Sequence, residues 1–340
     1  LWSEIEPENP EALFMGTNGL IESGRLSEAF ELSERLLKLG SRPLFLSIAN
    51  GATQVTDTQR EQLLGQFDAL LIERPTDLQL LICKGILLQQ QNKLKAALAV
   101  TQEALVIKDD DMQAAILEAK LLFQMNRSKD ALQRLAALLE RNPNNQRLRL
   151  QYARLLANID MAEAQNQFQR LSEQSPNDPD ILFSLGLVAQ ERKDFITAEK
   201  SFLQLLQLNQ RVDSAHFYLG QIEESRNNPD DALEHYQAVK SGTDFLPALN
   251  RTINILAQKN QLDEVNGLMK NYRQTLPTQA EQLYLLEAQA LANNNHLEPA
   301  QAILSEALEK TPESTDLLFT RAMVKEQRGL YEESEIDFRA

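Results

Sequence analysis

The chain repeats one pattern at a fixed interval of 34 residues. The pair Leu185-Gly186 recurs as Leu219-Gly220, and Ala198 recurs as Ala232 at the same spacing. A period of this length is typical of architectures in which one small structural unit is stacked many times. The repeat therefore constrains the fold more tightly than the length of 340 residues, which for a compact protein would suggest two or three domains.

A single copy of the pattern, residues 179–212, has the periodicity of two helices. Leu182 and Leu185 lie at the three-residue spacing of one helical face, and Phe202 and Leu205 repeat that spacing on a second segment. Each helix has about a dozen residues and a length of roughly 20 Å at 1.5 Å per residue. One such pair cannot bury both of its faces, so several copies must stack.

Small residues mark the places where the helices of a copy approach one another. Gly186 lies on the apolar face of the first helix and Ala198 on that of the second. A larger side chain at either position would overpack the crossing and cost roughly 1–3 kcal/mol. The pattern predicts an all-α fold without strands, a right-handed superhelix that is an α-solenoid of antiparallel helix pairs.

The register can be followed through the whole chain. The positions that close successive copies are Pro7, Ser41, Pro75, Asp109, Pro143, Pro176, Gln210, Asp244, Pro277 and Pro312. We predict a single array over residues 1–340, with nine complete repeats and partial repeats at 1–9 and 315–340. The chain starts inside a second helix, so we expect it to be an excised fragment whose N-terminal segment, with any targeting signal, is missing.

Composition excludes several classes of function. The net charge is −15, and a duplex-binding surface would need clustered Lys and Arg, so no nucleic-acid partner is predicted. No apolar run approaches 18 residues, which argues against a membrane span. The single cysteine, Cys83, permits no intrachain disulfide and is predicted to be a small buried side chain.

No constellation of catalytic or metal-binding residues is visible in the sequence. The three histidines are His216, His235 and His296, and no cysteine or second histidine stands at ligand spacing from any of them. A glycine-rich phosphate loop and a Gly-x-Ser-x-Gly elbow are both missing. We therefore predict no catalytic residue, no cofactor and no metal.

The residues of the repeat resemble the tetratricopeptide repeat superfamily over the full length of the chain. Within it, residues 211–221 (RVDSAHFYLGQ) and 317–324 (LLFTRAMV) resemble bacterial outer-membrane lipoproteins that partner a periplasmic carboxyl-terminal processing protease. This resemblance implies a periplasmic adaptor, anchored to the outer membrane, that tethers and activates the protease and presents substrates such as cell-wall hydrolases. Two alternatives stay open, a scaffold of a polysaccharide synthesis or export system and a repeat region cut from a larger enzyme such as a glycosyltransferase.

The partner-binding surface is predicted on the first helix of each pair, which lines the concave side of such a superhelix. The positions are Phe14, Ile48, Ile82, Ile116, Arg149, Phe183, Phe217, Asn250, Leu285 and Phe319. One turn further along lie Asn18, Lys120, Leu187, Gln221, Asn254, Gln289 and Met323. Either the apolar members pack against the next repeat, or they form an exposed stripe, rimmed by amides, for a protein or peptide segment. We single out Phe183 and Phe217 as aromatic anchors of that stripe.

Overall fold

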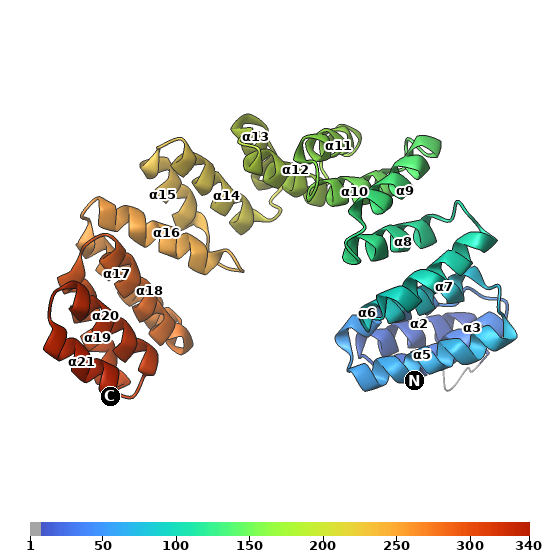
Figure 1. Cartoon of the computed structure of the whole chain (residues 1–340), viewed down its shortest axis with the longest axis horizontal. Helices are drawn as coiled ribbons and strands as arrows, with labels where there is room; N and C mark the ends of the chain where they lie inside the picture. The colour runs from blue at the N-terminus through green and yellow to red at the C-terminus, as the bar shows by residue number, and fades with distance from the viewer. Residues whose placement is uncertain (1–7) are drawn as a thin grey trace. The chain divides into compact units, whose positions relative to one another are not determined.

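The computed structural model describes residues 8–340, and all regular secondary structure in this range is helical. Twenty α-helices and two short 3-10 helices follow one another without a β-strand between residues 8 and 340 (Figure 1). The predicted all-α solenoid of helix pairs is confirmed. Residues 1–7 of the expected N-terminal partial repeat lie outside the described residues, and the count of nine complete repeats stays a prediction.

Contacts divide the chain into two compact units, with the boundary between Gln174 and Ser175. The helices of the first unit are α2 (Pro10–Glu22), α3 (Leu26–Lys38), α4 (Phe45–Gly51), α5 (Asp57–Glu73), α6 (Leu78–Gln90), α7 (Leu94–Ile107), α8 (Met112–Gln124), α9 (Ser128–Arg141), α10 (Gln146–Leu156) and α11 (Met161–Gln174). A 3-10 turn at Ala52–Gln54 follows α4. Most consecutive helices pack in pairs, such as α6 with α7, whereas the short α4 packs against α3 and α6.

The second unit continues in the same manner. Its helices are α12 (Pro179–Glu191), α13 (Phe195–Gln207), α14 (Val212–Ser225), α15 (Pro229–Ala238), α16 (Phe245–Gln258), α17 (Leu262–Thr275), α18 (Ala280–Asn293), α19 (Leu297–Lys310), α20 (Thr315–Gln327) and α21 (Tyr331–Arg339). A 3-10 turn at Pro277–Gln279 precedes α18. Each first helix in this unit packs on its own second helix, and α16 and α18 also contact each other directly.

Helix starts and turns recur in register because the same backbone groups need partners in every copy. The side chains of Asp77, Asp111, Asn145 and Asp178 cap α6, α8, α10 and α12 by accepting bonds from backbone N–H groups. Between the two helices of a pair the backbone turns through the left-handed region, which Gly and Asn adopt most easily. The residues there are Gly24, Asn92, Asn126, Lys193, Asn227, Asn260, Asn295 and Gly329.

The cores are built from small residues facing large ones. A Cβ atom added to Gly186 would lie 2.7 Å from the ring of Phe202, which confirms the close approach predicted there. Ala198 and Cys83 are fully buried, as expected from the sequence. Between residues 8 and 340 no helix combines the length and apolar composition that crossing a bilayer requires.

Candidate partner-binding groove

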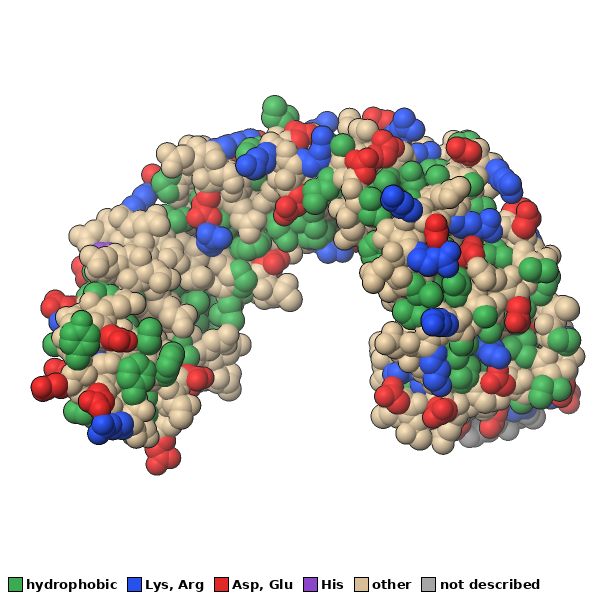
Figure 2. Space-filling view, in the orientation of Figure 1, with side chains coloured by type: hydrophobic (Ala, Val, Ile, Leu, Met, Phe, Trp, Pro, Cys, Tyr) green, Lys and Arg blue, Asp and Glu red, His purple; other side chains and the backbone are tan. Residues whose placement is uncertain are grey.

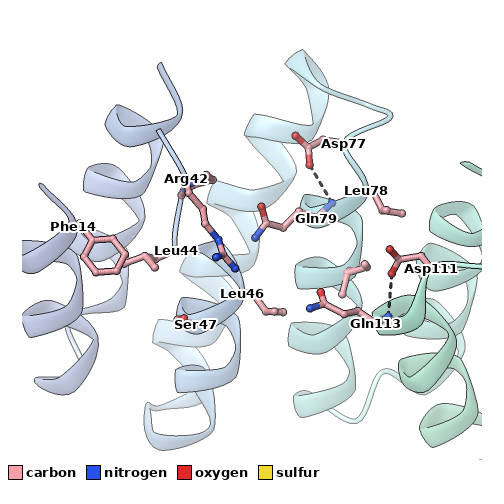
Figure 3. A pocket seen from close by; sticks show the side chains of 12 residues that line it. Phe14, Arg42, Leu44, Leu46, Ser47, Asp77, Leu78, Gln79, Asp111 and Gln113 are labelled. Atoms are coloured by element: carbon pink, nitrogen blue, oxygen red, sulfur yellow. Dashed lines mark hydrogen bonds between the residues drawn. The ribbon is translucent and has the colours of Figure 1, made fainter. Parts of the chain in front are cut away.

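A groove of about 880 Å³ runs over the first helices of the first unit. Its lining comes from Phe14 of α2, from residues 42–44, 46 and 47 before and within α4, from Leu78, Gln79 and Ile82 of α6, and from Gln113 of α8 (Figure 3). Leu44, directly before the short α4, and Leu46, within it, both line the groove. The result is an apolar surface bordered by amides.

The two carboxylates of this groove are used by the protein itself. Asp77 accepts bonds from the N–H groups of Gln79 and Leu80, and Asp111 does the same at the start of α8. Arg74 approaches Asp77 to 3.5 Å, and Lys108 approaches Asp111 to 3.9 Å. A carboxylate at a helix N-terminus is stabilised by the helix dipole, so both negative charges are largely compensated within their own repeats.

A second cavity of about 280 Å³ adjoins the first and shares Leu46, Ile82 and Gln113 with it. The shared residues make the two cavities one continuous surface along α4, α6 and α8, which we call the first-helix groove. Its second part carries amides, among them Gln90, whose Nε2 donates to the carbonyl of Ala49 at 2.9 Å. Figure 2 shows hydrophobic side chains on the first unit together with both basic and acidic ones.

Basic side chains gather at the second part of the groove. Lys120 of α8 and Arg147 of α10 both line it. Partial burial, and then the positive charges of Arg147 and Arg154, lower the pKa of Lys120. Lys120 stood at a predicted position, but Arg147 and the groove-lining residues 42–44, 46 and 47 were missed. Arg147 lies near the start of α10, before Arg149, which is the position of this helix that the repeat pattern predicts to bind a partner.

The predicted positions of the first unit do not share one environment. Phe14 is 44% exposed and lines the groove, whereas Ile82 and Ile116, at 3% and 8% exposed, are largely buried and reach the groove and its second part only with a small part of their surface. Ile48 is fully buried, and Arg149 is buried with its guanidinium donating to Gln167 Oε1 and to the carbonyl of Pro143, each at 2.5 Å. The prediction that Ile48 and Arg149 belong to an open surface is therefore wrong, because neighbouring helices cover both side chains.

Phe217, one of the two aromatic anchors predicted in the second unit, belongs to the core. It is 8% exposed and packs against Tyr218 and Tyr236, with ring centroids 5.3 and 5.9 Å away. Phe183 is half-buried, with its ring edge-on to Tyr218 and the guanidinium of Arg211 4.8 Å from its centroid. The packing interpretation thus holds for Phe217, because Tyr218 of the same helix and Tyr236 of the paired helix α15 pack against its ring.

The other predicted positions of the second unit are less buried. Leu187, Gln221, Asn250, Asn254 and Leu285 are half-buried, and Gln289 and Phe319 are exposed. The amides bond to each other between repeats: Asn294 Nδ2 donates to Asn254 Oδ1 at 2.9 Å, and Gln190 Nε2 donates to Gln221 Oε1 at 2.7 Å. These side chains link neighbouring first helices, so part of the expected amide rim is already engaged in internal hydrogen bonds.

Two histidines that the sequence keeps apart meet in the second unit. The Nδ1 atoms of His216 on α14 and His235 on α15 are 3.1 Å apart. Burial first, and then the charge of His235, lower the pKa of His216. No cluster of three or more metal-ligating side chains forms within residues 8–340. Ligand spacing along the sequence missed this pair because its members lie on different helices.

Comparison with known proteins identifies the repeat. Models of the tetratricopeptide repeat match residues 122–190 and 186–245. A TPR repeat-containing protein of Pseudomonas aeruginosa is 34% identical over 340 residues, and this chain spans 58% of its length. The C-terminal part of a TPR repeat-containing protein from Cytophaga hutchinsonii has a TM-score of 0.54 at 14% identity, covering 68% of this chain and 95% of that one. Residues 122–245 of the chain thus match the tetratricopeptide repeat, and the solved structure shares the helical fold.

Proposed function

We propose that the chain is a non-catalytic scaffold that binds a segment of a partner protein in the first-helix groove. The continuity of this groove along α4, α6 and α8 is the observation that carries the proposal. Tetratricopeptide repeats suggest such a role, and an elongated surface on parallel helices suits an extended or helical segment better than it suits a small molecule.

The chemistry of the groove supports the same role. Leu44, Leu46 and Phe14 offer apolar contact area for the side chains of a bound segment. Gln79 and Gln113 border that area, and an amide can donate to a peptide carbonyl as well as accept from a peptide N–H. A segment lying along the groove would thus meet apolar contacts for its side chains and hydrogen-bonding groups for its backbone.

We further propose that the partner is a periplasmic carboxyl-terminal processing protease or a cell-wall enzyme, which the chain tethers or activates while presenting substrates. The support for this narrower role is the resemblance carried by residues 211–221 and 317–324. The helices α14 and α20 hold most of these residues.

A steric block of the groove tests the proposal. Ser47 is exposed and lines the groove, so Ser47→Trp fills the space without removing a buried side chain. Gln62→Trp, on the exposed side of α5, is the matched control. Binding to the purified carboxyl-terminal processing protease of the same organism is measured by size-exclusion chromatography, and its activity by a proteolysis assay. The intact chain and the control should bind the protease and speed up cleavage. Ser47→Trp should bind more weakly and speed up cleavage less.

The outcomes separate the two parts of the proposal. No binding of the protease to the intact chain contradicts the protease role. Binding that Ser47→Trp leaves unchanged contradicts the role of the first-helix groove, whatever the partner. Faster proteolysis with the intact chain and the control, but not with Ser47→Trp, supports both parts of the proposal.

A further inference from the structure

We infer that the first-helix groove selects an acidic partner segment, whose Glu or Asp side chains pair with Arg42, Lys120 and Arg147. This inference rests on the proposed function, because it names the chemistry of the segment that the groove would bind. It is carried by the way charges are distributed between the groove and the rest of the first unit.

The positive charges of the groove have no internal partners, whereas its negative charges do. Asp77 and Asp111 each cap a helix and lie near a basic side chain, as described above. In the described part of the chain, Arg42, Lys120 and Arg147 form no ion pair. The groove therefore presents an uncompensated positive charge to whatever lies in it.

Some basic side chains close to the groove do have carboxylate partners. The chain has 49 acidic and 34 basic residues, so carboxylates are plentiful. On the same helices, Lys84 of α6 pairs with Asp68 at 2.8 Å, and Arg134 of α9 pairs with Glu118 of α8 at 3.0 Å. Lys120, by contrast, has Arg147 and Arg154 nearby, and its pKa is lowered first by burial and then by the repulsion of these like charges. A carboxylate placed among these side chains relieves that repulsion.

The spacing of the cations indicates what the segment should look like. Arg42 precedes α4 and Lys120 lies on α8, with α6 packed between these helices. Two steps between neighbouring helices of about 10 Å each separate the two charges by roughly 20 Å across the helices. Lys120 also lies about ten residues further along its helix than the repeat position of Arg42, which adds roughly 15 Å along the axis. The two charges are therefore roughly 25 Å apart, and an extended chain covers that distance in about eight residues at 3.3 Å each. A matching segment has one acidic side chain that pairs with Arg42 and another that pairs with Lys120. The residues between them are apolar and contact the apolar lining of the groove.

Defined peptides test the inference with the whole 340-residue chain. The probe is a fluorescent peptide of alternating leucine and serine with two glutamates about eight residues apart, blocked at both ends so that no terminal carboxylate is present. Its counterparts carry glutamine or lysine instead of glutamate. Fluorescence anisotropy at low salt should show the glutamate peptide binding about tenfold more tightly than the glutamine peptide, and added salt should shrink the difference.

Charge reversal locates the effect. Lys120→Glu with Arg147→Glu should transfer the preference from the glutamate to the lysine peptide. Lys95→Glu with Lys129→Glu changes the net charge equally at exposed sites on α7 and α9 and should leave the preference unchanged. Equal binding of the glutamate and glutamine peptides would overturn the inference.

The result also distinguishes this inference from the proposed function. If all three peptides bind alike and Ser47→Trp weakens them all, the groove binds segments without selecting acidic ones. If no peptide binds, the inference is wrong, and the protease-binding assay with Ser47→Trp still decides the proposed function. If the control pair Lys95→Glu and Lys129→Glu abolishes the preference, overall charge rather than the groove is responsible, which also overturns the inference.

Discussion

Replacing Gly186 with alanine should weaken the second unit, although alanine is the better helix former. A Cβ atom at this position of α12 would lie 2.7 Å from both Cε1 and Cζ of Phe202. The ring of Phe202 is fully buried and stacks on Tyr218, with centroids 5.3 Å apart and an interplanar angle of 12°. The ring therefore has little freedom to move away from an added methyl group.

Two opposing terms set the expected size of the effect. Exchanging Gly for Ala within a helix contributes about 1 kcal/mol of stability through intrinsic helix propensity. Overpacking of a dense core costs roughly 1–3 kcal/mol, and the upper part of that range applies because the contact is far inside normal van der Waals distance. The net expectation is a loss of about 1–2 kcal/mol in the free energy of unfolding.

A matched glycine in the same unit isolates the clash from the propensity. Gly267 lies on the exposed side of α17, and a Cβ atom there would meet no heavy atom within 4 Å. Gly267→Ala should therefore stabilise the chain by about 0.5–1 kcal/mol. Urea unfolding followed by circular dichroism gives both values, and hydrogen exchange in α12 and α13 shows whether the loss is local.

A double-mutant cycle with Phe202→Leu assigns the cause. Leucine lacks the ring edge that the new methyl group would strike, so Gly186→Ala should become neutral or stabilising in that background. The reasoning is refuted if Gly186→Ala stabilises the original chain as much as Gly267→Ala does. It is also refuted if the cost is unchanged when Phe202 is leucine.

Two further predictions concern buried charge. The pKa of His216 is lowered in the folded state, so the unfolded chain binds the proton more readily. The contribution of His216 to stability should therefore be complete above pH 6.5 and decrease as the pH falls below that value. Urea titrations between pH 7.5 and 5.5 should show this decrease for the intact chain and a smaller one for His216→Gln. Arg273 forms an ion pair with Glu287, whose side chain is 1% exposed, so Arg273→Met should cost about 3–5 kcal/mol near neutral pH. Because burial already raises the pKa of Glu287, the cost should shrink on acidification, and an undiminished cost at pH 5, measured by the same unfolding assay, would contradict the assignment.

The sequence was sufficient for every feature that repeats. The 34-residue period predicted the helix pairs, and the small residues at Gly186 and Ala198 predicted where the helices of a pair meet. These features depend on local periodicity and on side-chain volume, which are the same in each well-formed copy. The left-handed turn residues, such as Asn92 and Asn126, follow the same register and could have been found from the sequence too.

The tertiary structure decided which side of a repeat is open. Ile48 and Phe14 are equivalent in the repeat, yet Ile48 is fully buried and Phe14 is 44% exposed. Burial depends on the side chains that the neighbouring helices bring, and these differ between copies. The meeting of His216 with His235 has the same origin, and so does the position of Lys120 beside Arg147 without an ion pair to any described residue. Contacts between helices of different sequence, rather than the period they share, determine where a partner can bind.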